Sequence, residues 1–292
     1  MKTDLLLHPK TSTQAEAFLT KPSQGLLITG AAGVGKYALA KTLAANILGL
    51  SESEKLDKYP YFYLIKRPAD KQEITIDQVR ALISNLTLKT PGANALRRIV
   101  IVEDANNLST EAQNSLLKTL EEPPADTIVI LTALGASYLL PTVSSRLQKL
   151  EVQPTSLNAA LKYYGSQFDS EAVESAWALS QGGAGLLSAL LNDEQSHPLK
   201  QGVDRFKQFL SGSRYDRLVI IDKLDKNKLE LAAFIDAGAR IMTVLYKEAV
   251  QQRDQSRSAK WLKARKDLLR ASEQLTANVS ARLLVLNLAL NL

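Results

Sequence analysis

Short apolar runs alternate with helical patterns over the first half of the chain. The runs are rich in β-branched residues and are bounded by glycine or polar residues, which is typical of central strands in a parallel sheet. Between them, apolar residues recur at intervals of three and four, as on one face of a helix. This alternation predicts an α/β domain with a parallel sheet. The expected strands are 25–29, 61–65, 99–102 and 127–131, and the expected helices are 11–19, 37–48, one that begins at Thr75 or Asp77, and 110–121.

After Glu151 the pattern is helical only. Glycines at 182–185 interrupt it, and the polar stretch 192–202, which contains a proline, is predicted as a linker. We expect one helix capped by Thr155 or Ser156, a second over 170–180 and a third after the glycines. From residue 204 on, the periodicity is helical almost throughout and ends with a closing helix at 282–292. The domains that follow are an α/β domain over 1–152, a small helical domain over 153–200 and a second helical domain over 201–292.

Composition restricts the chemistry. The 292 residues are 45% hydrophobic, enough for more than one core, and contain no cysteine, which excludes disulfides, thiolate zinc sites and cysteine nucleophiles. The two histidines lie far apart, so no metal site is expected. A net charge of +6 permits contact with nucleic acid without establishing it. No apolar run reaches the roughly 20 residues of a membrane span, and no secretory signal is evident, so we expect a cytoplasmic protein without a membrane partner.

The residues 30–37, GAAGVGKY, form a candidate phosphate-binding loop. Gly30, Gly33, Gly35 and Lys36 lie between an expected strand and an expected helix, which is the context that such a loop requires. Its backbone N–H groups would hold phosphates, and the lysine would neutralise the outer ones. An ordinary glycine turn is the alternative, which the strand and helix on either side disfavour.

One feature argues against hydrolysis at this loop, and a pair of acids farther along the chain belongs to the same candidate site. Tyr37 stands where a serine or threonine hydroxyl would bind Mg²⁺, and a phenol on a long rigid ring cannot take that place. Glu103 and Asp104 follow the strand 99–102, so they are candidates for the same site, with two solvated acids as the alternative. We therefore expect ATP binding to be possible but weak or absent, Mg²⁺ binding to be impaired, and ATPase activity to be low or absent.

Two longer motifs carry a resemblance to a known family. NSLLKTLEEPP at 114–124, followed by LLPTVSSR at 139–146, resembles the bacterial clamp-loader AAA+ subunits of DNA polymerase III. The segments 61–65, 74–83 and 276–290 extend the resemblance over nearly the whole chain. It implies an AAA+ parallel-sheet P-loop domain, a helical lid domain and an all-α collar domain. It also implies a role in DNA replication, within a hetero-oligomer of gamma/tau and delta subunits that loads a sliding clamp on primed DNA. The four-cysteine zinc module common in this family is missing, so no zinc is expected.

Within this family the chain is more similar to the delta-prime subunit, a stator, than to the gamma/tau-type motor. AAA+ motors carry Asp followed by Glu, whereas this chain has Glu103 followed by Asp104. The family's sensor-1 polar residue is not evident near 134–135, where Thr132 is the nearest candidate, and Leu186 stands where a sensor-2 arginine is common. Together with Tyr37, these changes mean that the hydrolysis machinery is expected to be weakened in four places.

One part of that machinery is retained. Ser145-Arg146 resembles the family's serine–arginine motif, whose arginine is presented to the ATP of the adjacent subunit. A guanidinium suits this task because it stays charged and binds phosphate oxygens with a planar fork. Arg146 is therefore the expected catalytic group, acting in trans. The alternatives are an active gamma/tau-type AAA+ ATPase and a nucleotide-binding module outside DNA replication. The basic stretch 253–270 is expected to be a solvated collar helix, with contact to DNA or a single-strand-binding protein as its alternative.

Overall fold

The computed structural model describes residues 5–68, 71, 73–88, 90–91, 96–224 and 228–276. The chain divides into two compact units, one of residues 1–156 with 183–185 and one of residues 157–182 with 186–292. The helix expected at 282–292 and the family-like segment 276–290, except Thr276, lie outside the described residues. The separation of the helical half into domains over 153–200 and 201–292 stays a prediction. Within the described part of the chain, no helix combines the length and apolar character needed to cross a membrane.

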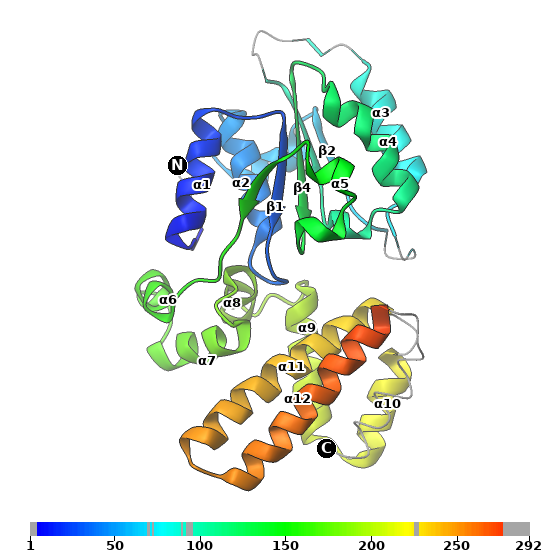
Figure 1. Cartoon of the computed structure of the whole chain (residues 1–292). Coiled ribbons are helices and arrows are strands. Elements are labelled where there is room, and N and C mark those ends of the chain that lie inside the picture. The colour runs from blue at the N-terminus through cyan, green and yellow to red at the C-terminus, as the bar shows by residue number, and fades with distance from the viewer. Residues whose placement is uncertain are drawn as a thin grey trace. The chain divides into compact units, whose positions relative to one another are not determined.

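The first unit is built on a parallel sheet of five strands in the order β2-β3-β4-β1-β5 (Figure 1). The central strands are largely buried, as their uninterrupted apolar runs predict. The sequence pattern missed β5, because its four residues, QKLE, are mostly polar and only one is buried. The strands are β1 (Gly25–Thr29), β2 (Phe62–Ile65), β3 (Arg98–Val102), β4 (Thr127–Ala133) and β5 (Gln148–Glu151).

Helices cover both faces of this sheet (Figure 1). Successive strand residues point to opposite faces, so Leu27 and Val100 pack with α3 and α4, whereas Leu26 and Ile99 pack with α1 and α2. The four helices lie where the periodicity predicts them, and Thr75 is the N-cap of α3. Their bounds are α1 (Pro9–Thr20), α2 (Lys36–Ile47), α3 (Ile76–Leu86) and α4 (Thr110–Glu121).

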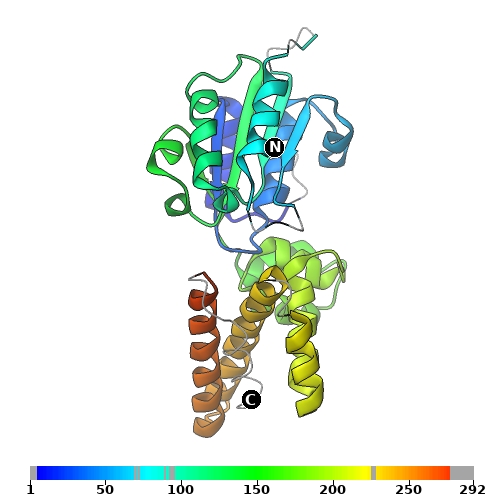
Figure 2. The ribbon, with the colours of Figure 1, turned by 90° about the vertical axis from the view of Figure 1, so that its right-hand side faces the viewer.

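The second unit is helical. In both views α11 and α12 run side by side (Figures 1 and 2). Its core contains Phe206, Phe209 and Phe234, whose ring centroids lie 4.9–5.6 Å apart. The helices of this half are α6 (Leu157–Tyr164), α7 (Ser170–Ser180), α8 (Ala184–Leu191), α9 (Pro198–Ser211), α10 (Arg214–Leu224), α11 (Lys228–Gln251) and α12 (Gln255–Thr276).

The linker predicted over 192–202 is wrong in its second part, because α9 begins at Pro198. Proline is favoured at the first helical position, where its missing N–H costs nothing. The cap is His197, whose Nδ1 accepts a hydrogen bond from the Lys200 N–H at 3.4 Å. The buried Lys200 ammonium pairs with Asp193 at 2.5 Å and with Asp204 at 2.7 Å, so the chain around the helix start is tied in place.

Candidate nucleotide site and candidate arginine finger

The loop between β1 and α2 has the backbone that its three glycines suggest. Their φ angles are positive, at 153° for Gly30, 84° for Gly33 and 92° for Gly35. A Cβ on Gly30 would lie 2.7 Å from the carbonyl oxygen of Val152, so no side chain fits there. Gly35 is the left-handed N-cap of α2, a conformation that costs other residues roughly 1–2 kcal/mol. The loop therefore leads into the amino end of a helix, whose unpaired N–H groups are the donors that bind phosphate.

Lys36 is the first residue of α2 and is buried. Its ammonium donates to the carbonyl oxygens of Gly30 at 3.0 Å and Ala31 at 3.1 Å. Burial lowers the pKa of Lys36, and the negative charges of Asp104 and Glu103 oppose that shift. Among the described residues no carboxylate forms a salt bridge with it, so its partners are neutral carbonyls that a phosphate could replace.

The predicted acids lie at the carboxyl end of β3, beside the loop. The Asp104 backbone is left-handed, with φ 48°, and its N–H donates to the Thr132 hydroxyl at 2.9 Å. Burial, followed by the charge of Asp104, raises the pKa of Glu103, and two nearby lysines oppose this. Thr132, the nearest sensor-1 candidate, thus reaches the backbone of the acidic pair from buried β4. One edge of the sheet therefore gathers Lys36, both acids and this threonine.

Two cations beside these acids were not predicted. Lys66 and Arg67 directly follow β2, and the register Ile65 to Val102 places them next to the acids that follow β3. Burial lowers the pKa of Arg67, and the charge of Asp104 opposes that shift. The adjacency was accessible from the sequence, because neighbouring parallel strands end at the same edge of a sheet. The carboxylates therefore lie near cations that belong to the protein itself.

Tyr37 is packed rather than exposed at the mouth of the loop. Burial, then the charges of Glu103 and Asp57, raises the pKa of Tyr37 to about 12, so its phenol is neutral at pH 7. The Lys41 ammonium lies 5.8 Å from the tyrosine ring centroid and 2.6 Å from the Asp57 carboxylate. No cluster of three or more His, Cys, Asp or Glu suited to a metal ion occurs in the part of the chain that the structure describes.

Arg146 lies on the surface of the first unit, just after the short helix α5 (Pro141–Ser144) and its C-cap Ser145. Its side chain is 34% exposed. The Nε donates to the Glu121 carboxylate at 2.9 Å, and Nη2 donates to the same oxygen, Oε1. Nη1 donates to the Thr142 carbonyl at 2.6 Å. The guanidinium is thus both accessible and held.

The sheet register places Arg146 and the phosphate loop at opposite ends of the sheet. Leu26 pairs with Gln148 in the parallel ladder between β1 and β5, so Arg146 lies level with Gln24. The loop begins at Gly30, six residues after Gln24 and directly past the end of β1, which corresponds to about 20 Å at roughly 3.3 Å per residue. An arginine side chain spans far less than this distance. Arg146 therefore cannot reach the phosphate loop of its own chain.

The remaining sequence-predicted residues lie in the second unit. Leu186 is fully buried in α8. The basic stretch 253–270 falls on α12, apart from its first residues, and most of its cations are exposed. Arg265 differs, because its Nε donates to Thr243 of α11 at 2.9 Å. The exposed cations on α12 are Arg257, Lys260, Lys263, Lys266 and Arg270.

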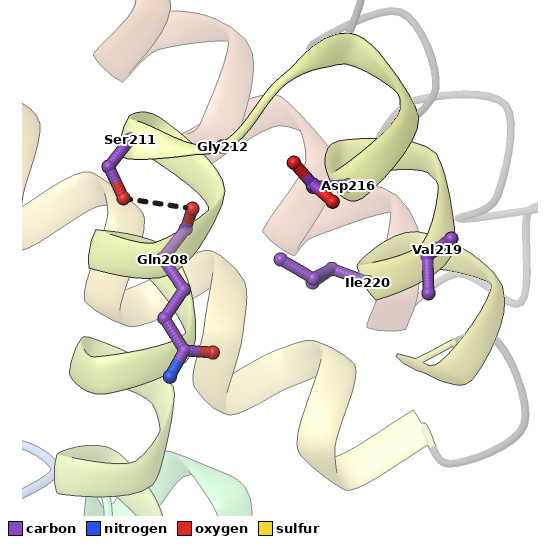
Figure 3. A pocket seen from close by; sticks show the side chains of 6 residues that line it. All are labelled: Gln208, Ser211, Gly212, Asp216, Val219 and Ile220. Carbon is purple, nitrogen blue, oxygen red and sulfur yellow. Dashed lines mark hydrogen bonds between the residues drawn. The ribbon is translucent and has the colours of Figure 1, made fainter.

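A hollow of about 300 Å³ lies between α9 and α10 in the second unit (Figure 3). Its one ionisable lining residue is Asp216, whose carboxylate accepts from the Ser213 N–H at 2.9 Å and from the Ser213 hydroxyl at 2.7 Å. This carboxylate therefore serves the start of α10. The hollow is lined by Gln208, Ser211, Gly212, Asp216, Val219 and Ile220.

Comparison with known proteins adds a family to this geometry. The family model described as "DNA polymerase III, delta subunit" matches residues 10–156, half of the chain. The delta′ subunit of DNA polymerase III from Pseudomonas aeruginosa is 31% identical over 208 residues, which are 64% of this chain and 62% of the relative. The Escherichia coli delta′ subunit is 30% identical over 138 residues, 47% of this chain and 41% of the relative. The chain thus matches about three fifths of the length of the former and two fifths of the latter.

A solved structure extends the likeness of fold to the helical half. The gamma subunit-related DNA polymerase III protein of Thermotoga maritima superposes with a TM-score of 0.57 at 19% identity, over 96% of this chain and 97% of that one. The predicted fold class is confirmed: a parallel-sheet P-loop domain of the AAA+ type, followed by helical regions.

Proposed function

The chain belongs to the family of DNA polymerase III delta subunits, and we propose that it works as a delta-prime-like clamp-loader subunit in DNA replication. In this proposal it occupies one place in a hetero-oligomer with gamma/tau and delta subunits, which opens a sliding clamp and loads it on primed DNA. Its contribution to chemistry is Arg146, offered to the ATP of a neighbouring subunit.

The observation that carries this proposal is the position of Arg146. The guanidinium is accessible, yet it lies about 20 Å along the sheet from the only phosphate loop predicted in its own chain. A cation in this place cannot act on a phosphate bound at the loop of its own chain, so the proposed target is a nucleotide held by a neighbouring subunit. Its charge is permanent and its N–H groups form a planar fork, which suits the developing charge of a phosphoryl group in transfer.

The chain's own loop fits phosphate but does not fit Mg²⁺. The glycine backbone, the amino end of α2 and the Lys36 ammonium are the groups that bind phosphate oxygens. Mg²⁺ prefers several oxygen ligands in a compact octahedron, whereas Tyr37 offers a neutral phenol and the two acids lie beside Lys66 and Arg67. A nucleotide bound here would therefore be held without being hydrolysed.

The test is the effect of Arg146→Ala on a reconstituted loader. We expect the isolated chain to show no ATP turnover, with or without primed DNA. The complex with Arg146→Ala should hydrolyse ATP at least about 10-fold more slowly at the site that the finger serves, because such fingers contribute roughly 10³–10⁵ in other phosphoryl-transfer enzymes. Arg80→Ala, at an exposed position of α3, is the matched control. Loading by the Arg146→Ala complex at the normal rate would defeat the assignment.

An active gamma/tau-type ATPase is the second candidate. The gathering of Lys36, Glu103, Asp104 and Thr132 at one edge of the sheet favours it, because a working site needs a phosphate-binding lysine and nearby carboxylates. ATP turnover by the isolated chain that disappears in Lys36→Ala would support this candidate against the first.

A further inference from the structure

The two most specific sequence motifs meet in the fold. LEEPP ends α4 and contains Glu121, and the Ser-Arg segment after α5 contains Arg146, 25 residues farther along the chain. Their side chains form an ion pair at the surface of the first unit. We propose that Glu121 is a positioning residue, which holds the Arg146 guanidinium in the orientation that meets a neighbour's phosphate. This inference rests on the proposed finger role of Arg146.

The contact joins two helices that are fixed to one another. Val143 of α5 is buried in the same apolar cluster as Leu116 and Leu120 of α4. The buried Gln113 of α4 accepts a hydrogen bond from the Leu140 N–H at 2.8 Å, directly before α5 begins. Glu121 therefore stands on a rigid base, so it can fix the arginine rather than follow it.

The hydrogen bonds leave two N–H groups of the guanidinium unused among the described residues. Arginine has five N–H donors in a fixed plane. Nε and Nη2 donate to the Glu121 carboxylate, and Nη1 donates to the Thr142 carbonyl. Among the described residues these three donors are the ones that are used, so one N–H on each terminal nitrogen is left. These two N–H groups can donate to oxygens of a phosphate.

Holding the arginine beforehand removes a cost of catalysis. A long exposed side chain loses rotamer freedom when it is fixed against a phosphate, and that loss would fall on the transition state if the arginine were mobile. The Glu121–Arg146 pair is exposed on both sides, at 49% and 34%, so it adds little to the stability of the fold. The effect of Glu121 is therefore expected in the partner's rate and not in the unfolding of this chain.

The experiment measures the DNA-stimulated ATPase of the reconstituted complex with variants of Glu121. We expect Glu121→Ala to lower kcat about 10-fold with little change in KM, since misplacing a catalytic group by about 1 Å can cost 10²-fold. Glu121→Asp keeps the charge but withdraws the carboxylate by one methylene, and it should be as slow as the alanine variant. Glu121→Gln keeps an acceptor at the same place and should stay within about 3-fold of the wild type, because uncharged acceptors still orient a donor. Glu122→Ala, at the next residue of the same motif, is the matched control and should be unchanged.

A double variant separates positioning from structure. Glu121→Ala combined with Arg146→Ala should be no slower than Arg146→Ala alone, and the unfolding temperature of each variant should equal that of the wild type. If Arg146→Ala has no effect, the proposed finger is wrong. If Arg146→Ala slows the complex while Glu121→Ala and Glu121→Asp match or exceed the wild-type rate, the finger stands and Glu121 does not position it.

Discussion

A buried ion pair at the amino end of the sheet allows a quantitative prediction for Asp126→Asn. Asp126 precedes β4, and its Oδ1 accepts from Arg98 Nε at 3.0 Å and from Arg98 Nη2 at 2.6 Å. The Arg98 side chain is 5% exposed, and its Nη1 also donates to the carbonyls of Leu86 at 2.6 Å and Leu88 at 3.0 Å. The substitution keeps the shape of residue 126 and removes the charge opposite this guanidinium.

The expected loss of stability follows from the ion pair and from the shifted pKa of Asp126. Burial opposes ionisation of Asp126, but hydrogen bonds from Thr90, Arg98 and Thr127, with the Arg98 charge, outweigh it and lower the pKa to about 2. Relative to the ordinary pKa of 3.8, this shift corresponds to about 2 kcal/mol of stabilisation of the folded state. Screening by the solvent that reaches the pair reduces this contribution to roughly 1–2 kcal/mol. Removing one partner also leaves a buried charge uncompensated, which costs about 3–5 kcal/mol. Because asparagine can still accept hydrogen bonds, we expect a loss of about 3 kcal/mol at pH 7.

The pH dependence has a definite sign. The folded-state pKa of Asp126 lies below the unfolded value, so its contribution is present above about pH 4 and is lost as the pH falls toward 2. The difference between wild type and Asp126→Asn should therefore shrink by roughly 1–2 kcal/mol over that range.

Urea unfolding, followed in two ways, measures this loss. Far-ultraviolet circular dichroism reports both units, whereas the two tryptophans, Trp177 and Trp261, both lie in the second unit and report it alone. If the two units unfold separately, Asp126→Asn should lower the urea midpoint of the first unit, measured by circular dichroism. The midpoint measured by tryptophan fluorescence should then stay unchanged. Asp57→Asn is the matched control, since Asp57 is 54% exposed and its pair with Lys41 should contribute less than about 1 kcal/mol. An Asp126→Asn effect no larger than that of the control would refute the reasoning.

Two further substitutions test the nucleotide loop and the helical unit. Tyr37→Thr supplies the short hydroxyl that Mg²⁺ requires, so nucleotide affinity measured by calorimetry should become higher with Mg²⁺ than with a chelator. An equal response of variant and wild type to Mg²⁺ would show that the acids and their cations, not Tyr37, decide the metal dependence. Gly202→Ala would place a Cβ 2.4 Å from the Ala233 carbonyl oxygen, which forces α9 away from α11. The free energy of unfolding of the second unit, measured by tryptophan fluorescence, should then fall by about 2 kcal/mol or more. Gly135→Ala, whose Cβ would meet nothing closer than 3.6 Å, should leave that free energy unchanged. Similar midpoints for the two variants would contradict the close packing.

Local signals along the chain were sufficient for most helices and strands. The helix 110–121 could be predicted to its ends because the signals are adjacent: Ser109 accepts a hydrogen bond from the Ala112 N–H at 3.1 Å, and two prolines follow at 123–124. The central strands are buried on both faces, so their residues form uninterrupted apolar runs. The same kind of signal misled at Pro198, where a helix begins rather than a linker continues, since one proline serves both purposes.

The amino-acid sequence by itself determined the residue types at the candidate site, namely the glycine loop, Lys36 and Arg146, because their spacing and motifs are local. Only the tertiary structure decided which of them meet. Parallel register sets Arg146 about 20 Å from its own loop, and the packing of α4 on α5 brings Glu121 to it from 25 residues away. The register of β2 against β3 places Lys66 and Arg67 next to the acids after β3. Such neighbours are joined by strand pairing and helix packing, which act between segments that the chain keeps far apart, so no local pattern records them.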